Sequence, residues 1–283
     1  MIRLPEDKVI ITAALTGGFV GKKECPTLPM QPDEITEAAY ACYNEGAAIV
    51  HLHARDKDGV PTGKATVFQE IHDKIRAKCD IILQDSTGGG ANLTLDERLD
   101  CLNAHPEMAS CNMGSMLRTV GSRAGTVWVN TRDDIEYYAT RMRELGIKPE
   151  IEIYSPGFFT ELKNLISKEL LEKPYYVDLI LGMPYQGSFE ASPRNLMYLY
   201  ESLPEDALFN TLAVGRHQNP LTTMGMILGG CIRVGLEDNI YYKKGEFATN
   251  QQLVARAVRI ARELGKEPAK PSEARSILGL KPL

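Results

Sequence analysis

The sequence lacks closely spaced cysteine pairs. Its 283 residues include six cysteines, one tryptophan and five histidines, and none of the cysteines forms a CxxC pair. The cysteines are Cys25, Cys42, Cys79, Cys101, Cys111 and Cys231. Most of them follow or lie within apolar or helical patterns, which is typical of reduced, buried cysteines in a cytosolic protein.

Long apolar runs and clusters of basic residues are also absent. No run is long enough to cross a membrane, and the first eight residues lack the apolar core of a signal peptide. The 32 basic and 37 acidic residues are interspersed, with a formal charge of -5. No basic run is interleaved with aromatic residues, as nucleic-acid binding would favour. We therefore expect a cytoplasmic protein that binds neither membranes nor nucleic acid.

Short apolar runs alternate with amphipathic segments along the whole chain. The apolar runs predict strands at 9–14, 48–53, 81–84, 108–112, 150–154, 176–181, 208–214 and 231–235. The amphipathic segments predict helices at 33–44, 67–78, 95–103, 133–145, 159–171, 193–203, 221–229 and 250–264. Eight such units predict an α/β fold, a (β/α)8 TIM barrel that forms a single domain over 1–283 with a short C-terminal helical tail. A doubly wound open sheet is the alternative, but no GxGxxG follows the first strand.

Two of the histidines, His51 and His53, stand one residue apart at the end of the second predicted strand. Residues i and i+2 of a strand point to the same face, so both imidazoles can converge on one divalent metal. The alternative is a strand with two hydrogen-bonded histidines near its end. A metal site at the strand end is the functional interpretation.

A catalytic zinc site usually has three protein ligands and one open position. Glu237, just past the eighth predicted strand, is the best placed third ligand, and Glu152 and Asp238 compete with it. Arg233 lies four residues before Glu237 and five before Asp238. An Arg–carboxylate pair would hold Asp238 ionised and oriented, as a base must be. The alternative is a structural salt bridge.

Other polar residues follow the remaining strands. In a barrel of this class the chemistry lies at the C-terminal ends of the strands. Ordinary loop polarity explains each residue alone, whereas the whole ring predicts the site of a small-molecule enzyme. The ring includes Thr16, Ser86, Thr87, Ser110, Asn112, Glu152, Tyr154, Tyr185, Arg216 and His217.

Seven motifs in order resemble one known family. The chain resembles the β-keto acid cleavage enzymes, whose first characterised activity is cleavage of 3-keto-5-aminohexanoate. The resemblance covers nearly the whole chain, and several motifs in one order are far more specific than a single His-x-His. The motifs are Ile11–Gly17, His51–Arg55, Ser86–Gly89, Pro106–Asn112, Pro149–Glu152, Asn195–Tyr198 and Arg233–Asn239.

The resemblance implies a zinc-dependent barrel that condenses a β-keto acid with acetyl-CoA, giving acetoacetate and a new acyl-CoA. It implies that His51, His53 and Glu237 are the zinc ligands and that Asp238 with Arg233 removes the acidic proton of the substrate. Positions that contact the substrate or assist catalysis are matched by Ser86, Glu152 and Ser110, the last standing where the family often has Thr. The neighbouring Thr87 and Asn112 are expected to bind substrate with them.

Phe19 departs from part of the family. Members that act on amino-substituted keto acids resemble one another in having a Glu at this position, which would pair with an ammonium group. With Phe19 there, we expect a substrate side chain that is not cationic. The alternative is that Glu24, on the same loop, replaces the missing carboxylate.

The loop after the seventh predicted strand departs as well. Residues 215–220 are similar to the Gly-Arg-Trp-His loop of the family but lack the Trp. Arg216 is a candidate for a CoA phosphate or a substrate carboxylate, with a structural role as the alternative. Lys22 and Lys23 are weaker candidates for CoA phosphates.

Three rival functions use the same features. A metal-dependent aldolase on this barrel would not need acetyl-CoA. A metal-dependent hydrolase of the amidohydrolase type would carry its His-x-His on the first strand, a Lys on the fourth and further histidines on the fifth and sixth. This sequence has no histidine between residues 106 and 216. A non-catalytic metal-binding barrel would not need Arg233, Asp238 and Ser86. The tail after Pro268 and the connection at 113–130 are docking elements that favour a homo-oligomer, with a tetramer preferred.

Overall fold

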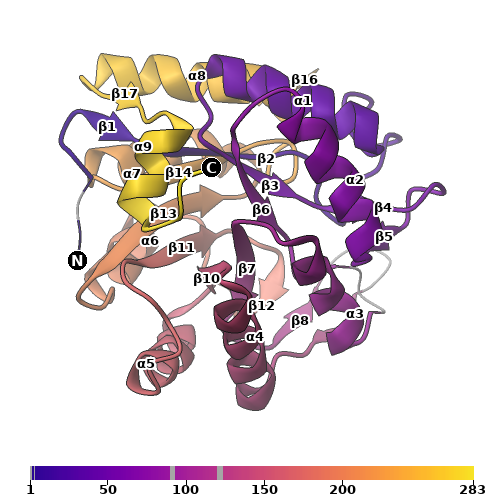
Figure 1. The fold of residues 1–283 in the computed structure, drawn as a ribbon. Helices are drawn as coiled ribbons and strands as arrows, with labels where there is room; N and C mark the ends of the chain where they lie inside the picture. Colours follow the sequence, from indigo (N-terminus) through magenta and orange to yellow (C-terminus); the bar gives the residue numbers. More distant parts are fainter. Residues whose placement is uncertain (1, 3, 90–92, 120–123) are drawn as a thin grey trace.

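Eight parallel strands form a closed barrel (Figure 1). The computed structural model describes residues 2, 4–89, 93–119 and 124–283. The barrel strands follow the chain order, and their runs of Ile, Val, Leu and Ala are buried on both faces, as parallel strands beneath helices require. The predicted (β/α)8 barrel is confirmed. The strands are β2 (Ile11–Ala14), β3 (Ile49–Leu52), β6 (Ile82–Asp85), β7 (Met108–Asn112), β10 (Lys148–Ile153), β11 (Tyr175–Leu181), β13 (Ala207–Ala213) and β14 (Cys231–Val234).

The helices lie around the outside of the barrel (Figure 1). Local signals set their ends: Pro32 begins the first and Gly46, with φ of 113°, ends it, while Thr131 caps the N-terminus of α4. Within the described residues the helices are α1 (Pro32–Glu45), α2 (Ala65–Arg76), α3 (Leu95–Leu99), α4 (Arg132–Leu145), α5 (Phe159–Ser167), α6 (Pro193–Glu201), α7 (Gln218–Ile227), α8 (Asn250–Glu263) and α9 (Pro271–Leu278), with short 3-10 turns η1 (Asp100–Ala104), η2 (Pro156–Phe158) and η3 (Gly215–His217).

The two ends of the barrel differ in chemistry. At the N-terminal end, Ile49, Ile82 and Met108 pack with Ala274 and Leu278 of α9 in one apolar cluster. Helix α9 therefore closes this end, and it corresponds to the predicted C-terminal tail. Toward the other end the interior is polar, with buried side chains that include Thr12, His51, Gln84, Glu150, Asp178, Asn210 and Arg233. Polar groups are buried only where they are paired or functional, so this end holds the candidate site.

Short strands between the barrel elements were not predicted. The connection at 113–130, expected as a loop, contains β8 (Met116–Arg118) and β9 (Val127–Trp128), which form a three-stranded sheet with β12 (Tyr185–Gln186); residues 120–123 of it lie outside the described part. The helix predicted over 95–103 is divided into the α-helix α3 and the 3-10 turn η1 that follows it directly. The remaining short pairs are β1 (Lys8–Val9) with β17 (Glu267–Pro268), β4 (Ala54–Arg55) with β5 (Pro61–Thr62), and β15 (Tyr241–Lys243) with β16 (Glu246–Phe247).

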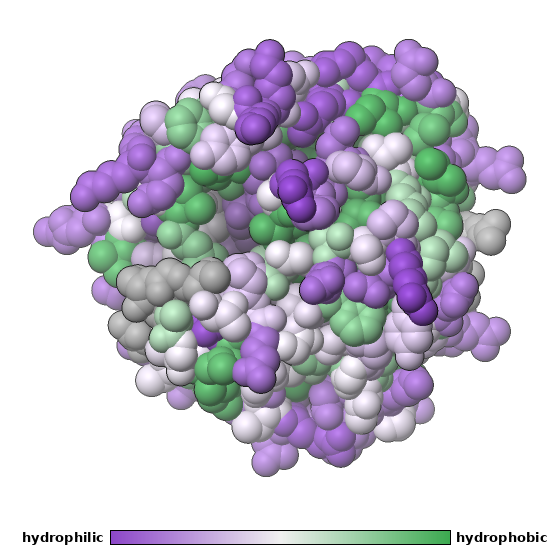
Figure 2. Space-filling model, turned by 180° about the vertical axis from the view of Figure 1, so that it is seen from behind, coloured by the Kyte–Doolittle hydropathy of each residue, from purple (hydrophilic) through white to green (hydrophobic). Residues whose placement is uncertain are grey.

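The surface is largely hydrophilic (Figure 2), and most of the cysteines lie beneath it. From behind, Figure 2 shows hydrophilic side chains over much of the surface, with hydrophobic patches among them. All six cysteines are free, and five of them are buried, as the sequence predicts. None of the helices within the described residues combines the length and the apolar character that spanning a membrane requires.

A tight turn after β14 returns the chain toward β2. Gly235 has φ of 151°, and a Cβ there would lie 2.0 Å from the carbonyl oxygen of Ala14. Two residues later the Glu237 N–H donates to the same oxygen at 3.2 Å. Because only glycine fits between the two strands, the turn brings Glu237 directly over the end of β2.

We predict that Gly235→Ala lowers the free energy of unfolding by about 3 kcal/mol, because a side chain would meet the Ala14 backbone. Gly245→Ala is the matched control, since Gly245 also has a positive φ of 78° but would place its Cβ in open space. That variant should lose only about 1 kcal/mol. Urea denaturation of both variants measures the difference, and equal losses would show that the clash with Ala14 is not decisive.

Candidate active site

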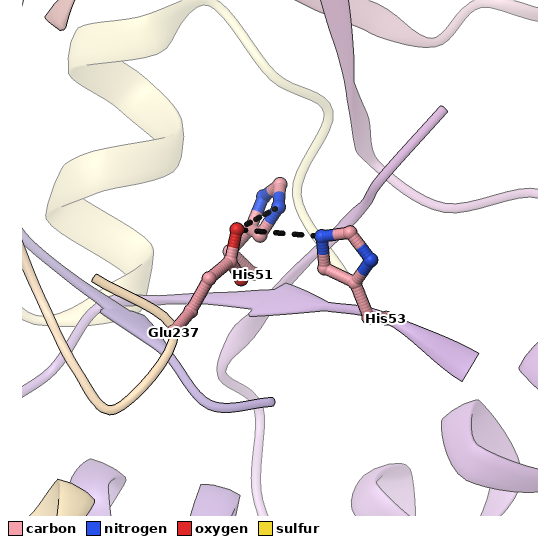
Figure 3. Close-up of side chains that lie close together, drawn as sticks. All are labelled: His51, His53 and Glu237. Carbon is pink, nitrogen blue, oxygen red and sulfur yellow. Dashed lines mark ion pairs between the residues drawn. The ribbon is translucent and has the colours of Figure 1, made fainter. Parts of the chain in front are cut away.

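Three side chains form a potential metal cluster at the C-terminal end of the barrel. His51 lies in β3, His53 directly follows it, and Glu237 follows β14 (Figure 3). Oε1 of Glu237 lies 3.7 Å from Nε2 of His51 and 3.3 Å from Nε2 of His53. One potential ligand atom from each residue lies within 4.8 Å of the others. Two imidazoles and one carboxylate directed at a common point can bind one divalent cation.

Two further observations fit a cation at this point. Oε2 of Glu237 is buried and has no hydrogen-bond partner among the described residues, an unfavourable state that a bound cation would relieve. Burial also lowers the pKa of His51 to about 3, with help from the nearby charge of Arg233. Its imidazole is therefore neutral at physiological pH, which is the form that binds metals.

Gln84 orients His51. The Nδ1–H of His51 donates to Oε1 of Gln84 at 2.8 Å, and the two residues are register partners in the neighbouring strands β3 and β6. With its proton on Nδ1, the ring directs the lone pair of Nε2 toward Glu237. The partner on the next strand thus selects the tautomer that a metal site needs.

A single buried guanidinium holds both acidic residues of the turn after β14. Nε and Nη2 of Arg233 donate to the two carboxylate oxygens of Asp238, both at 2.9 Å. Nη2 also donates to Oε1 of Glu237 at 2.6 Å. Burial raises the pKa of Asp238 to about 6, and the attraction of Arg233 opposes this rise. Burial likewise acts to raise the pKa of Glu237, but Arg233 and the two histidines hold it well below its usual range.

Two adjoining cavities open onto these groups. A small cavity of about 50 Å³ is lined by both histidines and Glu237 together with Ser86, Glu152 and Trp128. A wide cavity of about 470 Å³ is lined mainly by apolar side chains and also reaches Glu237, Asp238 and Arg233. Glu152 lines both cavities, and burial raises its pKa to about 8. A potential metal site, the carboxylate of Asp238 and a cavity that could bind a substrate therefore lie next to one another.

The other sequence-predicted residues fall into two groups. Phe19 lines both cavities and Ser86 lines the small one. Thr87 and Ser110 instead bond to each other, through the Thr87 N–H to Ser110 Oγ at 3.1 Å and the Thr87 hydroxyl to the Ser110 carbonyl at 2.8 Å. Asn112 accepts the Gly114 N–H. These last three residues are not among the residues that line either cavity.

The candidate CoA-binding residues do not themselves line the two cavities. Lys22 pairs with Glu34. Arg216 donates to the neighbouring His217 at 3.3 Å and lines a surface groove that shares Met183, Pro184 and Tyr185 with the wide cavity. Glu24, the alternative acid on the first loop, accepts the Gly21 N–H at 3.0 Å and does not line either cavity.

The sequence of the whole chain was compared with models of known protein families. The model of the beta-keto acid cleavage enzymes matches residues 8–280. The chain belongs to the beta-keto acid cleavage enzyme family. The metal-cluster residues and the Arg233–Asp238 pair all lie within the matched region, so the candidate site is part of the family's barrel rather than of an added segment.

Several relatives are similar to this chain over nearly their full length. The 3-keto-5-aminohexanoate cleavage enzyme of Fusobacterium nucleatum subsp. nucleatum is 40% identical, over 97% of this chain and 99% of that protein. The 3,5-dioxohexanoate:acetyl-CoA acetone transferase of Paraburkholderia graminis is 35% identical, over 97% and 96%. The 3-oxoadipate:acetyl-CoA acetyltransferase of Cupriavidus necator is 30% identical, over 96% and 94%.

A solved structure shares the fold. The apo structure of ObcA superposes with a TM-score of 0.75 at 20% identity, covering 90% of this chain and 66% of that one. At this identity the similarity extends to the barrel alone. The chain spans about two thirds of the length of ObcA.

Sequence reasoning about the family motifs missed three contributors to the site. Gln84 and Glu150 point into the barrel beside His51, with Glu150 Oε2 3.9 Å from His51 Nδ1. Arg55, quoted only as part of a motif, donates to the carbonyls of Gly17 and Val20, both at 2.7 Å, and so anchors the loop that carries Phe19. Strand alternation could have placed Gln84 and Glu150 inside the barrel, but their partners depend on strand register.

We predict that Gln84→Met weakens the binding of Zn²⁺ by about 10- to 100-fold, because the His51 ring loses the acceptor that fixes its tautomer. Titration of the metal-free protein against a chelating indicator measures the affinity. Gln69→Met, on the exposed surface of α2, is the matched control and should leave the affinity unchanged. An unchanged affinity in Gln84→Met would remove Gln84 from the site.

Proposed function

We propose that this protein is a zinc-dependent β-keto acid cleavage enzyme that condenses a β-keto acid with acetyl-CoA to give acetoacetate and a new acyl-CoA. The observation that carries this proposal is that Arg233 donates hydrogen bonds to both Glu237 and Asp238. Glu237 belongs to the potential metal cluster, and Asp238 is the next residue in the chain. Family membership supports it, as do the two relatives from Paraburkholderia graminis and Cupriavidus necator whose names include acetyl-CoA.

The proposed zinc ligands are His51, His53 and Glu237. Two imidazoles, one carboxylate and an open position are typical of catalytic zinc. Zinc bound there would supply Lewis acidity toward the carboxylate and ketone oxygens of a β-keto acid. Gln84 keeps His51 in the tautomer that this role needs.

Asp238 is the proposed base. At neutral pH, above the value of about 6 to which burial raises its pKa, Asp238 is ionised and takes a proton from C2 of the β-keto acid. The C2 carbanion attacks the acetyl carbonyl, and the CoA thiolate leaves. The thiolate then attacks the original ketone carbonyl, and the C2–C3 bond breaks. The proton on Asp238 returns to C2 of the released acetoacetate, so atoms and charges balance.

Other residues are proposed to hold the reactants. Ser86 and Glu152 line the small cavity, where a hydroxyl and a carboxyl that burial keeps protonated near neutral pH can donate to substrate oxygens. Ser110, Thr87 and Asn112 are retained as proposed substrate-binding residues. The hydrogen bonds between Thr87 and Ser110 join the loop after β6 to β7.

The substrate side chain is proposed not to be cationic. Phe19 places an aromatic ring in the walls of both cavities, and its ring centre lies 6.1 Å from that of Tyr185. The carboxylate of Glu24 bonds within its own loop. An ammonium group beside Phe19 would therefore have no acidic partner from this loop.

A cytoplasmic homo-oligomer, with a tetramer preferred, completes the proposal. The free cysteines support a reducing compartment. The strands β8 and β9, which extend from the barrel in the connection at 113–130, support a docking role for this segment.

We predict that Asp238→Asn lowers the kcat for acetoacetate formation from a β-keto acid and acetyl-CoA by about 10²- to 10⁴-fold, because the base is lost. Zinc content should not change, since Asp238 is not a proposed ligand. Asp178→Asn is the control: Asp178 is a nearby buried carboxyl that does not line either cavity, so the change should affect kcat far less. Unchanged kcat in Asp238→Asn would exclude it as the base, and cleavage without acetyl-CoA would favour an aldolase.

We predict that 3-oxohexanoate is cleaved with a kcat/KM about 10-fold or more above that of 5-amino-3-oxohexanoate, because the ammonium group gains no partner at the Phe19 wall. Acetoacetate release with each substrate at saturating acetyl-CoA measures the ratio. A preference for the amino compound would contradict the proposed side-chain charge.

A further inference from the structure

Arg118 places a buried positive charge in the wall of the site. It ends β8, and only 5% of the residue is exposed. Its guanidinium carbon lies 5.5 Å from the ring centre of Phe19 and 6.0 Å from that of Trp128. The electron-rich faces of aromatic rings attract a cation and restrict where it lies. The charge of Arg118 is therefore held at a defined position between two rings.

The position of Arg118 is where the two cavities meet. It lines both of them, whereas His51 and His53 line only the small cavity, and Ile180 and Leu212 line only the wide one. A β-keto acid whose head group lies at the metal cluster must extend its remaining chain past this junction. Arg118 thus lies beside the part of the substrate that differs between β-keto acids.

Both walls of this junction are anchored. The side chain of Arg55 holds the loop of Phe19 through the carbonyls of Gly17 and Val20. On the other side, Arg118 is the register partner of Tyr185 in the antiparallel pair of β8 and β12. A donor group that the scaffold holds in place loses little conformational entropy on binding, so it can discriminate between ligands.

We propose that Arg118 selects β-keto acids whose far end carries a carboxylate, which makes β-keto dicarboxylates the preferred substrate class. This inference rests on the proposed function. The planar N–H fork of a guanidinium matches the two oxygens of a carboxylate, and the bond is strong where apolar walls exclude water. The same charge repels an ammonium group, and a neutral alkyl chain gains nothing from it.

The test compares two six-carbon substrates, 3-oxoadipate and 3-oxohexanoate, which differ by a terminal carboxylate in place of a methyl group. With acetyl-CoA, the native enzyme should cleave 3-oxoadipate with a kcat/KM at least 10-fold higher. Arg118→Met should lower that value by about 10- to 100-fold, mainly through KM, and should change the value for 3-oxohexanoate by less than about 3-fold. Arg118→Lys keeps the charge but not the planar fork of N–H donors. Its kcat/KM for 3-oxoadipate should therefore lie between the values of the native enzyme and Arg118→Met.

Arg132→Met is the matched control, because Arg132 pairs with Glu161 at the exposed end of α4; it should change neither value. Equal losses on both substrates in Arg118→Met would overturn the proposal, because Arg118 would then act on a group common to both reactions, such as acetyl-CoA. Equal cleavage of the two substrates by the native enzyme would overturn it as well.

A binding measurement separates this inference from the proposed function. If neither substrate is cleaved, the proposed function fails, and calorimetry with adipate and hexanoate then decides the role of Arg118. Adipate binding that is stronger than hexanoate binding, and that is lost in Arg118→Met, supports the carboxylate site. Equal binding of the two acids, or binding that Arg118→Met does not change, overturns it.

Discussion

The site depends on one buried interaction, the fork of Arg233 between Asp238 and Glu237. Two carboxylates on adjacent residues repel each other, and burial alone would raise the pKa of both. The guanidinium compensates both charges with three hydrogen bonds, while the turn at Gly235 holds the chain over β2. Because the same cation bonds to the proposed base and to a proposed metal ligand, one side chain orients both carboxylates.

The barrel separates stability from chemistry along its axis. Helix α9 and the apolar N-terminal ends of the strands form one buried apolar cluster. The burial of this cluster contributes to stability. The upper interior carries Gln84, Glu150 and Asp178 below the metal cluster, and burial raises the pKa of both acids. For Glu150 the pKa rises to about 8, so this carboxyl adds little negative charge beneath the cluster near neutral pH. The cost of burying polar groups is thus confined to the end where the site lies.

The head group and the side chain of the substrate are handled by different parts of the fold. The barrel strands and the turn after β14 supply the cluster and the base. The wall beside the side chain is built from loop elements, with Phe19 on the first loop and Arg118 on β8, which belongs to a small sheet outside the barrel. Relatives are named for amino, dioxo and dicarboxylic substrates. One barrel can serve several substrates when the loops that line the cavity differ while the strand ends that carry the chemistry stay the same.

The sequence alone determined the alternation of strands and helices, the common face of His51 and His53, and the spacing of Arg233 from its two acids. These features follow from local periodicity, which a chain carries in any window of a few residues. Tertiary structure decided that Gln84 is the partner of His51, that Thr87 bonds to Ser110, and that Arg118 meets Phe19. Such contacts depend on strand register and barrel closure, which join residues remote in sequence and which no local pattern encodes.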